Sequence, residues 1–240
     1  MSRPVHVALL HAYSARNSGD GLLVELSVGL LRGAFGADTR VSIVAADPAS
    51  FPAHPDVRPA PVLAAGAAGR LIGAAMAALP VGANPALADL RGLLKQVDLI
   101  VGVGGGYLRA RNSVEALKLE AGHLVQMRTA RAARKPAVYL PQSIGPAAGN
   151  AMLAGHLTSL LAGFHTVFVR DDRSMALLAA NPNTRRGPIS RCSNSAVGRP
   201  ACARTRMCRR PAPATSRWCC AVRPRGTPRN ARVTTRRRKR

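Results

Sequence analysis

The stretch Leu99–Leu108, LIVGVGGGYL, decides how the rest of the chain is interpreted. It begins as a continuous apolar run, which is typical of a strand buried on both faces of a parallel sheet. Three consecutive glycines, Gly104–Gly106, then predict a turn at which the backbone passes close to another group. We therefore expect a buried strand that ends at a binding edge.

Working outward from this stretch, apolar and β-branched runs alternate with segments whose apolar residues recur at helical spacing. The predicted strands are residues 4–10, 40–46, 98–103, 136–140 and 166–169. The predicted helices are 21–35, 64–79, 84–96, 113–133, 147–161 and 173–180, with Asp20, Asn84 and Ser113 as N-caps, and residues 47–61 form a loop. This alternation predicts an α/β, Rossmann-like fold, with a mainly parallel sheet and helices on both faces.

The net charge of +24 suggests a partner that is nucleic acid or a membrane surface, but the charge is unevenly distributed. From Thr184 onward there are 18 basic residues and no acidic ones, so that the first 183 residues carry 17 basic and 11 acidic residues. All five cysteines and Trp218 also lie beyond residue 183. We therefore expect two regions, a domain over 1–183 and an Arg/Pro/Cys-rich tail over 184–240.

The tail has almost no aliphatic periodicity, no interleaved aromatic residues and no C-x-x-C spacing. Back-translation of residues 187–197 with GC-rich codons, read from the third base, returns Pro-Asp-Leu-Ala-Val-Leu-Glu-Leu-Gly-Gly, which resembles an α/β protein. We expect a frameshift near Thr184 and a disordered tail, because so charged a segment cannot offset its ordering entropy. A tail that binds nucleic acid is the alternative, although no specific nucleic-acid partner is expected.

The first residues lack the pattern of a cleaved signal peptide, and the domain over 1–183 contains no cysteine. Residues 62–83 are apolar, but Arg70 and Pro80 interrupt them, so we expect a buried or interfacial helix and not a transmembrane segment. These features together predict a cytoplasmic protein.

Polar or glycine-rich residues follow four of the predicted strands. Ligands of open parallel sheets bind beyond the carboxyl ends of the strands. Each motif alone could be a turn or a helix cap, but four at one edge indicate a cleft. The candidate substrate-binding residues are Asn17, Gly19, Asp20, Gly104, Gly105, Gly106, Gln142, Ser143, Arg170, Asp171 and Ser174.

Other kinds of site fit less well. Gly102, Gly104 and Gly105 match part of the dinucleotide fingerprint, but its last glycine would fall at Tyr107, and the run does not follow the first strand. There is no P-loop and no serine in a nucleophile elbow. The histidines show no metal-ligand spacing, so that no metal and no cofactor are expected.

The four motifs together resemble the polysaccharide pyruvyl transferase family. The residues that carry the resemblance are Asn17–Asp20 (NSGD), Val101–Leu108 (VGVGGGYL), Leu140–Pro146 (LPQSIGP) and Val167–Leu178 (VFVRDDRSMALL). The resemblance covers residues 4–180 and implies the N-terminal half of a two-domain architecture like that of GT-B glycosyltransferases.

The resemblance also implies a function, which is transfer of a pyruvyl group from phosphoenolpyruvate to sugar hydroxyls of a cell-wall polysaccharide or exopolysaccharide. Such chemistry needs cations for phosphate and carboxylate, and an acid that protonates the vinyl carbon. Arg170, held by Asp171 or Asp172, is a candidate anion contact or a structural ion pair, while Asn17, Asp20 and Gln142 are candidates to bond the sugar.

The resemblance implies that the donor clamp and the acid come mainly from a second domain, which this chain lacks in recognisable form. The catalytic residues therefore stay unassigned, and the truncated chain is expected to be inactive. Two alternatives stay open: a GT-B-type glycosyltransferase that uses a nucleotide sugar, and a non-enzymatic binder that acts through its basic tail. The sequence leaves the acceptor sugar, the linkage and the oligomeric state open.

Overall fold

The computed structural model describes residues 3–61, 85–147 and 150–187, which all belong to one compact unit, Met1–Arg191. Three expectations therefore lie outside the described residues. They are the helix over 64–79, the Asn84 cap, and the tail from residue 188 onward.

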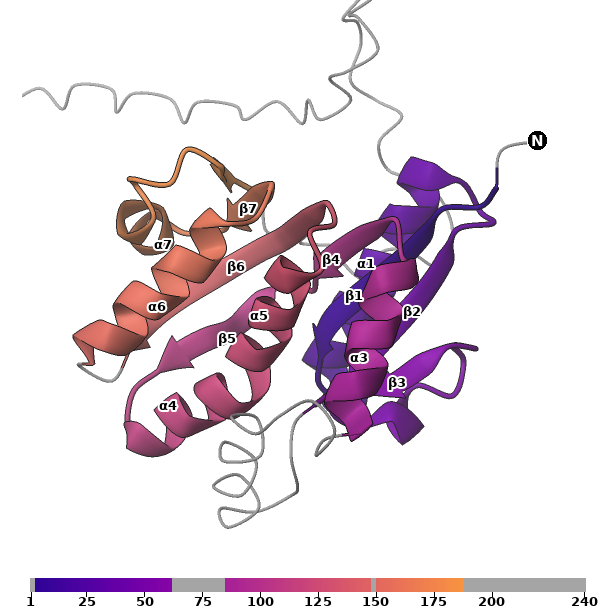
Figure 1. Cartoon of the computed structure of the whole chain (residues 1–240), viewed down its shortest axis with the longest axis horizontal. Coiled ribbons are helices and arrows are strands. Elements are labelled where there is room, and N and C mark those ends of the chain that lie inside the picture. Colours follow the sequence, from indigo (N-terminus) through magenta and orange to yellow (C-terminus); the bar gives the residue numbers. More distant parts are fainter. Residues whose placement is uncertain (1–2, 62–84, 148–149, 188–240) are drawn as a thin grey trace, which may run out of the picture. The chain divides into compact units, whose positions relative to one another are not determined.

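The described strands form one eight-stranded sheet in which every pairing is parallel (Figure 1). Seven strands follow one another in space, and the eighth, β5 (Gly105–Ala110), pairs with β6 alone. The spatial order is β3 (Val57–Pro59), β2 (Arg40–Ala45), β1 (His6–Ala12), β4 (Leu99–Gly102), β6 (Ala137–Ala147), β7 (Thr166–Val169) and β8 (Thr184–Arg186). The expected Rossmann-like α/β fold with a mainly parallel sheet is thus confirmed.

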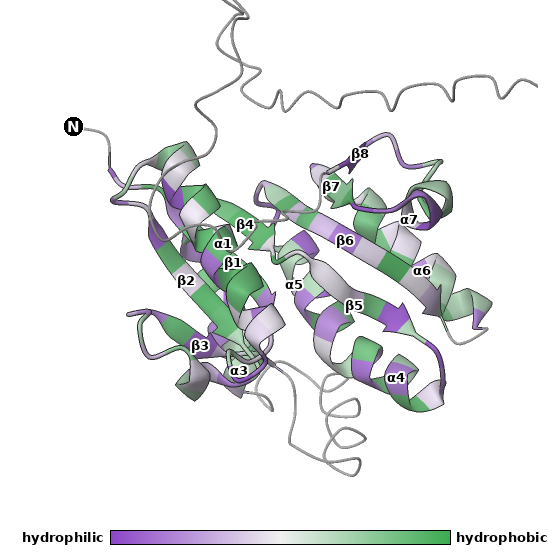
Figure 2. Cartoon of the chain, turned by 180° about the vertical axis from the view of Figure 1, so that it is seen from behind, coloured by the Kyte–Doolittle hydropathy of each residue, from purple (hydrophilic) through white to green (hydrophobic). Residues whose placement is uncertain are grey.

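Helices cover both faces of this sheet, as Figures 1 and 2 show from opposite sides. The longer ones are α1 (Ser18–Phe35), α3 (Pro85–Gln96), α5 (Val125–Ala132) and α6 (Ala151–Ala162). Shorter ones are η1 (Pro48–Ser50), α4 (Ser113–Lys118), the π-helical η3 (Leu119–Leu124) and α7 (Asp172–Leu177).

The core is divided by the sheet into two clusters, because successive side chains of a strand point to opposite faces. Val7 and Leu9 of β1 pack in a cluster with residues of α1, whereas Ala8 and Leu10 pack in a cluster with residues of α3, α5 and α6. Figure 2 shows β4, at the centre of the sheet, in the green of hydrophobic residues. The central strands are therefore held from both sides, which fixes the positions of their carboxyl ends.

The glycine-rich stretch departs from the expected turn. The chain breaks at Val103–Gly104 and then continues as β5 alongside β6, which runs on to Ala147 and so includes the QSIG residues expected in a loop. Pro141 lies within β6, although proline cannot donate to a sheet ladder. The pairing of β6 with β7 shifts register between Tyr139 and Gln142, which accommodates this proline.

Two predicted helix caps are wrong by one turn or less. Asn17, and not Asp20, caps α1 by accepting a hydrogen bond from Gly19 N, so that Asp20 lies in the first turn. Asn112, and not Ser113, caps α4 by accepting from Glu115 N. Asparagine in an extended conformation satisfies the free amides of a first turn as well as serine or aspartate does.

Three further features were not expected from the sequence. The short strands β3 and β8 lie in segments predicted as loop and tail, and β8 extends the sheet past the expected boundary at residue 183. The long helix over 113–133 contains the π-helical turn η3.

Over the ranges that the structure describes, no helix is long and apolar enough to cross a membrane.

Candidate functional site

The candidate site lies where the order of the strands reverses. β1 has β2 on one side and β4 on the other, and α/β sheets bind their ligands in the crevice beyond such a point. A pocket of about 620 Å³ opens there, lined from β1, α1, the β4–β5 break, β5, α4 and η3, and by Arg170 after β7. Its volume is in the range of small-molecule sites.

Glycines shape the floor of this pocket. Gly104, Gly105 and Gly106 line it, as the sequence predicted for a close approach of backbone to another group. Gly102 has a different purpose, because a Cβ there would lie 2.6 Å from the ring of Tyr139. Gly104–Gly106 therefore shape the pocket, whereas Gly102 makes room for the ring of the buried Tyr139.

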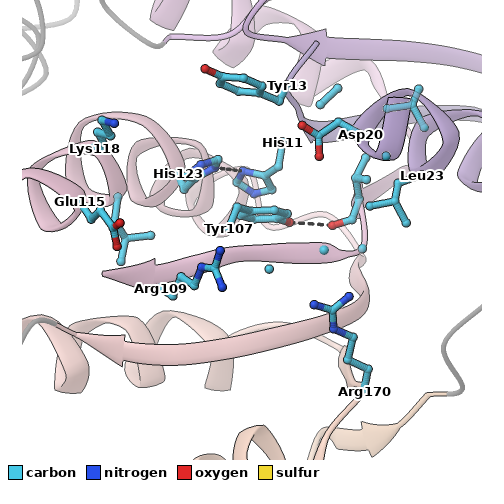
Figure 3. Close-up of a pocket in the computed structure, with 18 of the residues that line it drawn as sticks. His11, Tyr13, Asp20, Leu23, Tyr107, Arg109, Glu115, Lys118, His123 and Arg170 are labelled. Atoms are coloured by element: carbon cyan, nitrogen blue, oxygen red, sulfur yellow. Dashed lines mark hydrogen bonds between the residues drawn. The ribbon is translucent and has the colours of Figure 1, made fainter. Parts of the chain in front are cut away.

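One wall of the pocket carries positive charge (Figure 3). Arg109 and Lys118 are exposed, and neither forms an ion pair with any carboxylate among the described residues. Arg170 is half-buried, lies against Gly106, and donates from Nε to Ser143 Oγ at 2.5 Å. These three cations keep donors that a bound anion could use.

Two further charges of this wall satisfy each other. Arg111 Nη2 lies 3.1 Å from Glu115 Oε1, and the hydrogen bonds from Arg111 hold the pKa of Glu115 below its ordinary value. This pair has no net charge and therefore leaves the wall positive.

The opposite side of the pocket is formed by the loop after β1 and by α1. It presents the phenol ring of Tyr13, which is 60% exposed, and the carboxylate of Asp20 (Figure 3). Burial raises the pKa of Asp20, although the hydrogen bond from Asn17 Nδ2 at 2.9 Å opposes this. The carboxylate is thus held in place by the helix cap while one side of it faces the pocket.

Two histidines from distant parts of the chain meet at the back of the pocket. His11 Nδ1 lies 3.3 Å from His123 Nδ1, and the phenol of Tyr107 stacks on both rings, with centroid distances of 5.0 and 4.6 Å. On its other side His11 Nε2 lies 2.9 Å from the hydroxyl of Tyr139. Burial lowers the pKa of His11 well below its ordinary value and that of His123 to about 4, so that both rings are neutral at pH 7.

Irregular backbone brings these two rings together. His11 has a φ of 68°, in the left-handed region, which costs on the order of 1–3 kcal/mol for a residue other than glycine. Its amide donates to the buried Oε1 of Gln126 at 3.1 Å, which holds this conformation. His123 lies in the π-helical turn η3, a helix type that is rare and frequent at functional sites. Unfavourable backbone conformations of this kind persist only where contacts with the surrounding structure offset their free-energy cost.

Gln142, a predicted site residue, does not reach the pocket. It is fully buried, and its Nε2 donates to Tyr107 Oη at 2.9 Å and to the carbonyl of Val103. Tyr107 Oη in turn donates to the same carbonyl at 2.7 Å. Gln142 thus positions the tyrosine that stacks on the two histidines.

Ser143, Asp171 and Ser174 also lie outside the pocket, at the junction of β6, β7 and α7. Asp171 accepts from Ser143 Oγ at 2.6 Å and from the amide and hydroxyl of Ser174 at 2.8 Å each, and so caps α7. Ser174 Oγ is fully buried and accepts from Ile144 N. Burial would raise the pKa of Asp171, but these hydrogen bonds outweigh it and hold the pKa below its ordinary value.

The predicted site residues therefore divide into two groups. Gly19, Asp20, Gly104, Gly105, Gly106 and Arg170 line the pocket, whereas Asn17, Gln142, Ser143, Asp171 and Ser174 hold the elements around it. The sequence analysis missed His11, Tyr13, Tyr107, Arg109, Lys118 and His123. His11 and Tyr13 directly follow the predicted first strand and could have been found by that position. Nothing in the spacing pointed to His123, 112 residues away from its partner.

No trio of histidine, cysteine, aspartate and glutamate side chains that could hold a metal ion occurs within residues 3–61, 85–147 and 150–187. The described pocket offers cationic donors, the carboxylates of Asp20 and Glu115, and a stacked group of neutral aromatic and imidazole rings.

Comparison with known proteins gives one positive result. The family model described as polysaccharide pyruvyl transferase matches residues 17–188, from the cap of α1 to just past β8. Searches of curated proteins and of solved structures returned no significant match. The matched range is more than half of the chain and holds most of the pocket, and the chain therefore belongs to the polysaccharide pyruvyl transferase family.

Proposed function

We propose that the pocket beyond β1 and β4 binds phosphoenolpyruvate and a sugar of a polysaccharide, for transfer of a pyruvyl group to the sugar. The observation that carries this proposal is the division of charge across the pocket: unpaired cations on one wall and a carboxylate on the other. A phosphorylated carboxylic acid matches the first wall, and a neutral polyol matches the second.

The donor side is formed by Arg109, Lys118 and Arg170. Phosphoenolpyruvate carries a phosphate and a carboxylate close together, and guanidinium groups bind such oxygens through paired, charge-assisted hydrogen bonds. Arg170 is held by Ser143, which leaves its terminal nitrogens beside Gly106 for a ligand. The glycines let the backbone approach the same anion.

The acceptor side is formed by Asp20 and Tyr13. A carboxylate accepts a hydrogen bond from a sugar hydroxyl, and an exposed aromatic ring offers an apolar surface with a polar end. Because burial raises the pKa of Asp20, its carboxylate is a better proton acceptor than an exposed one. We assign to Asp20 the role of accepting the proton of the attacking hydroxyl.

The reaction balances as follows. The methylene carbon of the donor gains a proton, one sugar oxygen bonds to the adjacent carbon, the phosphate leaves, and a second sugar oxygen bonds to the same carbon. Of the two hydroxyl protons released, one accounts for the new methyl group and the other leaves with inorganic phosphate. The cations would stabilise the charge on the departing phosphate.

The test is calorimetric titration of phosphoenolpyruvate into the full chain. Binding is measured, and not turnover, because we expect part of the catalytic machinery to come from a second domain. Arg109→Gln should weaken binding by about 10- to 100-fold, since each charge-assisted hydrogen bond is worth roughly 1.5–3 kcal/mol. Arg173→Gln is the matched control, because Arg173 is exposed on α7 and lies outside the pocket.

Two results would overturn the proposal. The first is equal loss of affinity in both arginine variants, which would indicate attraction by net charge alone. The second is binding of a nucleotide sugar in place of phosphoenolpyruvate, which would support the glycosyltransferase alternative.

The reading-frame hypothesis belongs to the same proposal, because it decides which protein performs the reaction. The family match ends at residue 188, and β8 still pairs with β7 up to Arg186. Both findings favour a frame change after Gly187 over one at Thr184. Resequencing genomic DNA across codons 180–195 tests this. If the frame is unchanged, the basic tail belongs to the protein, and the alternative of a binder that acts through this tail would have to be tested. We also propose a cytoplasmic location, where the donor is available.

A further inference from the structure

The hydrogen bonds of the histidine pair at the back of the pocket fix which ring nitrogens carry protons. Two imidazole Nδ1 atoms face each other at 3.3 Å, so one must carry the proton and the other must accept it. The two possible positions of this proton imply different tautomers of His123. Either its Nε2 is a bare acceptor, or its Nε2–H is a donor.

The hydroxyl of Tyr139 decides between them. Tyr139 is fully buried, and His11 Nε2 at 2.9 Å is its one hydrogen-bond partner among the described residues. If His11 Nε2 donated to this hydroxyl, the phenolic proton would be left buried without an acceptor, which is unfavourable. If Tyr139 donates to His11 Nε2, both the phenolic proton and the imidazole nitrogen have a partner.

The remaining protons then follow in sequence. His11 Nε2 accepts, so that its proton lies on Nδ1 and is donated to His123 Nδ1. His123 in turn carries its proton on Nε2, which has no partner among residues 3–61, 85–147 and 150–187. His123 lines the pocket and is half-buried, and Tyr107 stacked on both rings holds their orientation.

We infer that His123 is a further ligand-binding residue, whose neutral Nε2–H donates a hydrogen bond to an anionic oxygen of the bound substrate. His11 and Tyr139 are positioning residues that act through it, by fixing its tautomer. Burial supports this arrangement, because it disfavours the charged form of both rings. The position of the donor is independent of the proposed reaction, whereas the class of ligand, a carboxylate or a phosphate, rests on the proposed function.

The tautomer is tested by NMR on the full chain with ¹⁵N-labelled histidine, using long-range correlations from the ring carbons' protons to both nitrogens. His123→Gln assigns the signals by their loss. The inference requires the shift of a protonated nitrogen at His123 Nε2 and of a bare nitrogen at Nδ1. The reverse pattern overturns it.

The positioning role is tested by a matched pair of variants that each remove one phenolic hydroxyl. Tyr139→Phe should shift His123 toward protonation at Nδ1, because His11 Nε2 loses its donor and recovers a proton. Tyr107→Phe is the control, since that hydroxyl bonds to Val103 and Gln142 and lies outside the chain of protons. Equal behaviour of the two variants would show that the tautomer of His123 does not depend on Tyr139.

The ligand contact is tested by titrating the labelled chain with pyruvate, which offers only a carboxylate, and separately with inorganic phosphate. A shift of His123 Nε2 with either probe supports the contact and identifies the group that makes it, while His156, outside the pocket, should stay unchanged. No shift with either probe overturns the contact. If phosphoenolpyruvate binds in calorimetry without moving His123, this inference fails alone; if the probes move His123 but phosphoenolpyruvate does not bind, the proposed function fails alone.

Discussion

The loop after β1 and the junction of β6, β7 and α7 both place polar side chains at the carboxyl edge of the sheet. At the junction, the side chains of Ser143, Asp171 and Ser174 form hydrogen bonds with one another and with the backbone. After β1, Asn17 does the capping and leaves Asp20 with one side toward the pocket. The comparison teaches that a polar residue at a strand end is available to a ligand only where its neighbours leave part of it unpaired.

Acidification should distinguish the pocket beside the loop after β1, which His123 lines, from the junction more strongly than any other change. Burial depresses the pKa of His123 to about 4 from the ordinary value of 6.5, so the unfolded chain binds more protons between these values. Stability should therefore fall as the pH drops from 6.5 to 4, by about 3 kcal/mol for this group. Urea unfolding across this range measures the fall. His123→Gln should remove the part of the fall that is due to His123 and leave the part that is due to His11, while the control His156→Gln should retain both.

The junction should respond at lower pH, because the pKa of Asp171 is depressed from 3.8. Its contribution to stability is complete above 3.8 and is lost as the pH falls through the lower, folded value. Loss of stability only below pH 3.8, with none between 6.5 and 4, would contradict the assignment of a neutral, buried histidine pair.

Removing the carboxylate of the junction should be the most damaging single substitution of the two regions. Asp171→Ala deletes the cap of α7 and the acceptor for two serine hydroxyls, which should cost about 3 kcal/mol. Chemical denaturation at pH 7 measures this loss. A change below about 1 kcal/mol would show that solvent replaces these hydrogen bonds and that the junction resembles the loop after β1.

Gly102, at the carboxyl end of β4, should be required for packing and not for ligand binding. Gly102→Ala places a Cβ 2.6 Å from the ring of Tyr139 and should cost about 2 kcal/mol through overpacking. Gly92→Ala, in α3 with open space around it, is the control and should gain roughly 0.5–1 kcal/mol. Thermal unfolding of both variants gives the comparison, and equal effects would remove the packing argument.

The smallest effect on stability is expected at Asp20. Asp20→Asn should change the free energy of unfolding by no more than about 0.5 kcal/mol, because Asn17 and not Asp20 caps the helix. Because burial raises its pKa, the wild-type carboxylate slightly disfavours folding at neutral pH, and this penalty fades as the pH falls toward 3.8. A loss near that of Asp171→Ala would show that Asp20 is structural, which would weaken its assigned role in the reaction.

Much of the fold could be predicted because it depends on local patterns. Alternating apolar strands and helices predicted the parallel α/β sheet, and the segments 40–46 and 166–169 match β2 and β7 within one residue. β5 was missed because its glycines favour a turn, and β8 because its basic residues resemble the segment after it. Both are short strands stabilised mainly by their pairing with a neighbour, which is information that no local window contains.

By itself, the sequence determined the class of fold, the edge of the sheet that carries the pocket, and the family, because these follow from periodicity and from motifs in order. Only the tertiary structure decided which polar residues are free. Asp171 and Asp20 both lie at the N-terminus of the helix that follows their strand, yet Ser143 of β6 and Ser174 of α7 satisfy the first, and the pocket leaves the second open. The pairing of His11 with His123 also depends on contacts across the fold, because a positive φ and a π-helical turn are held by packing and not by local preference.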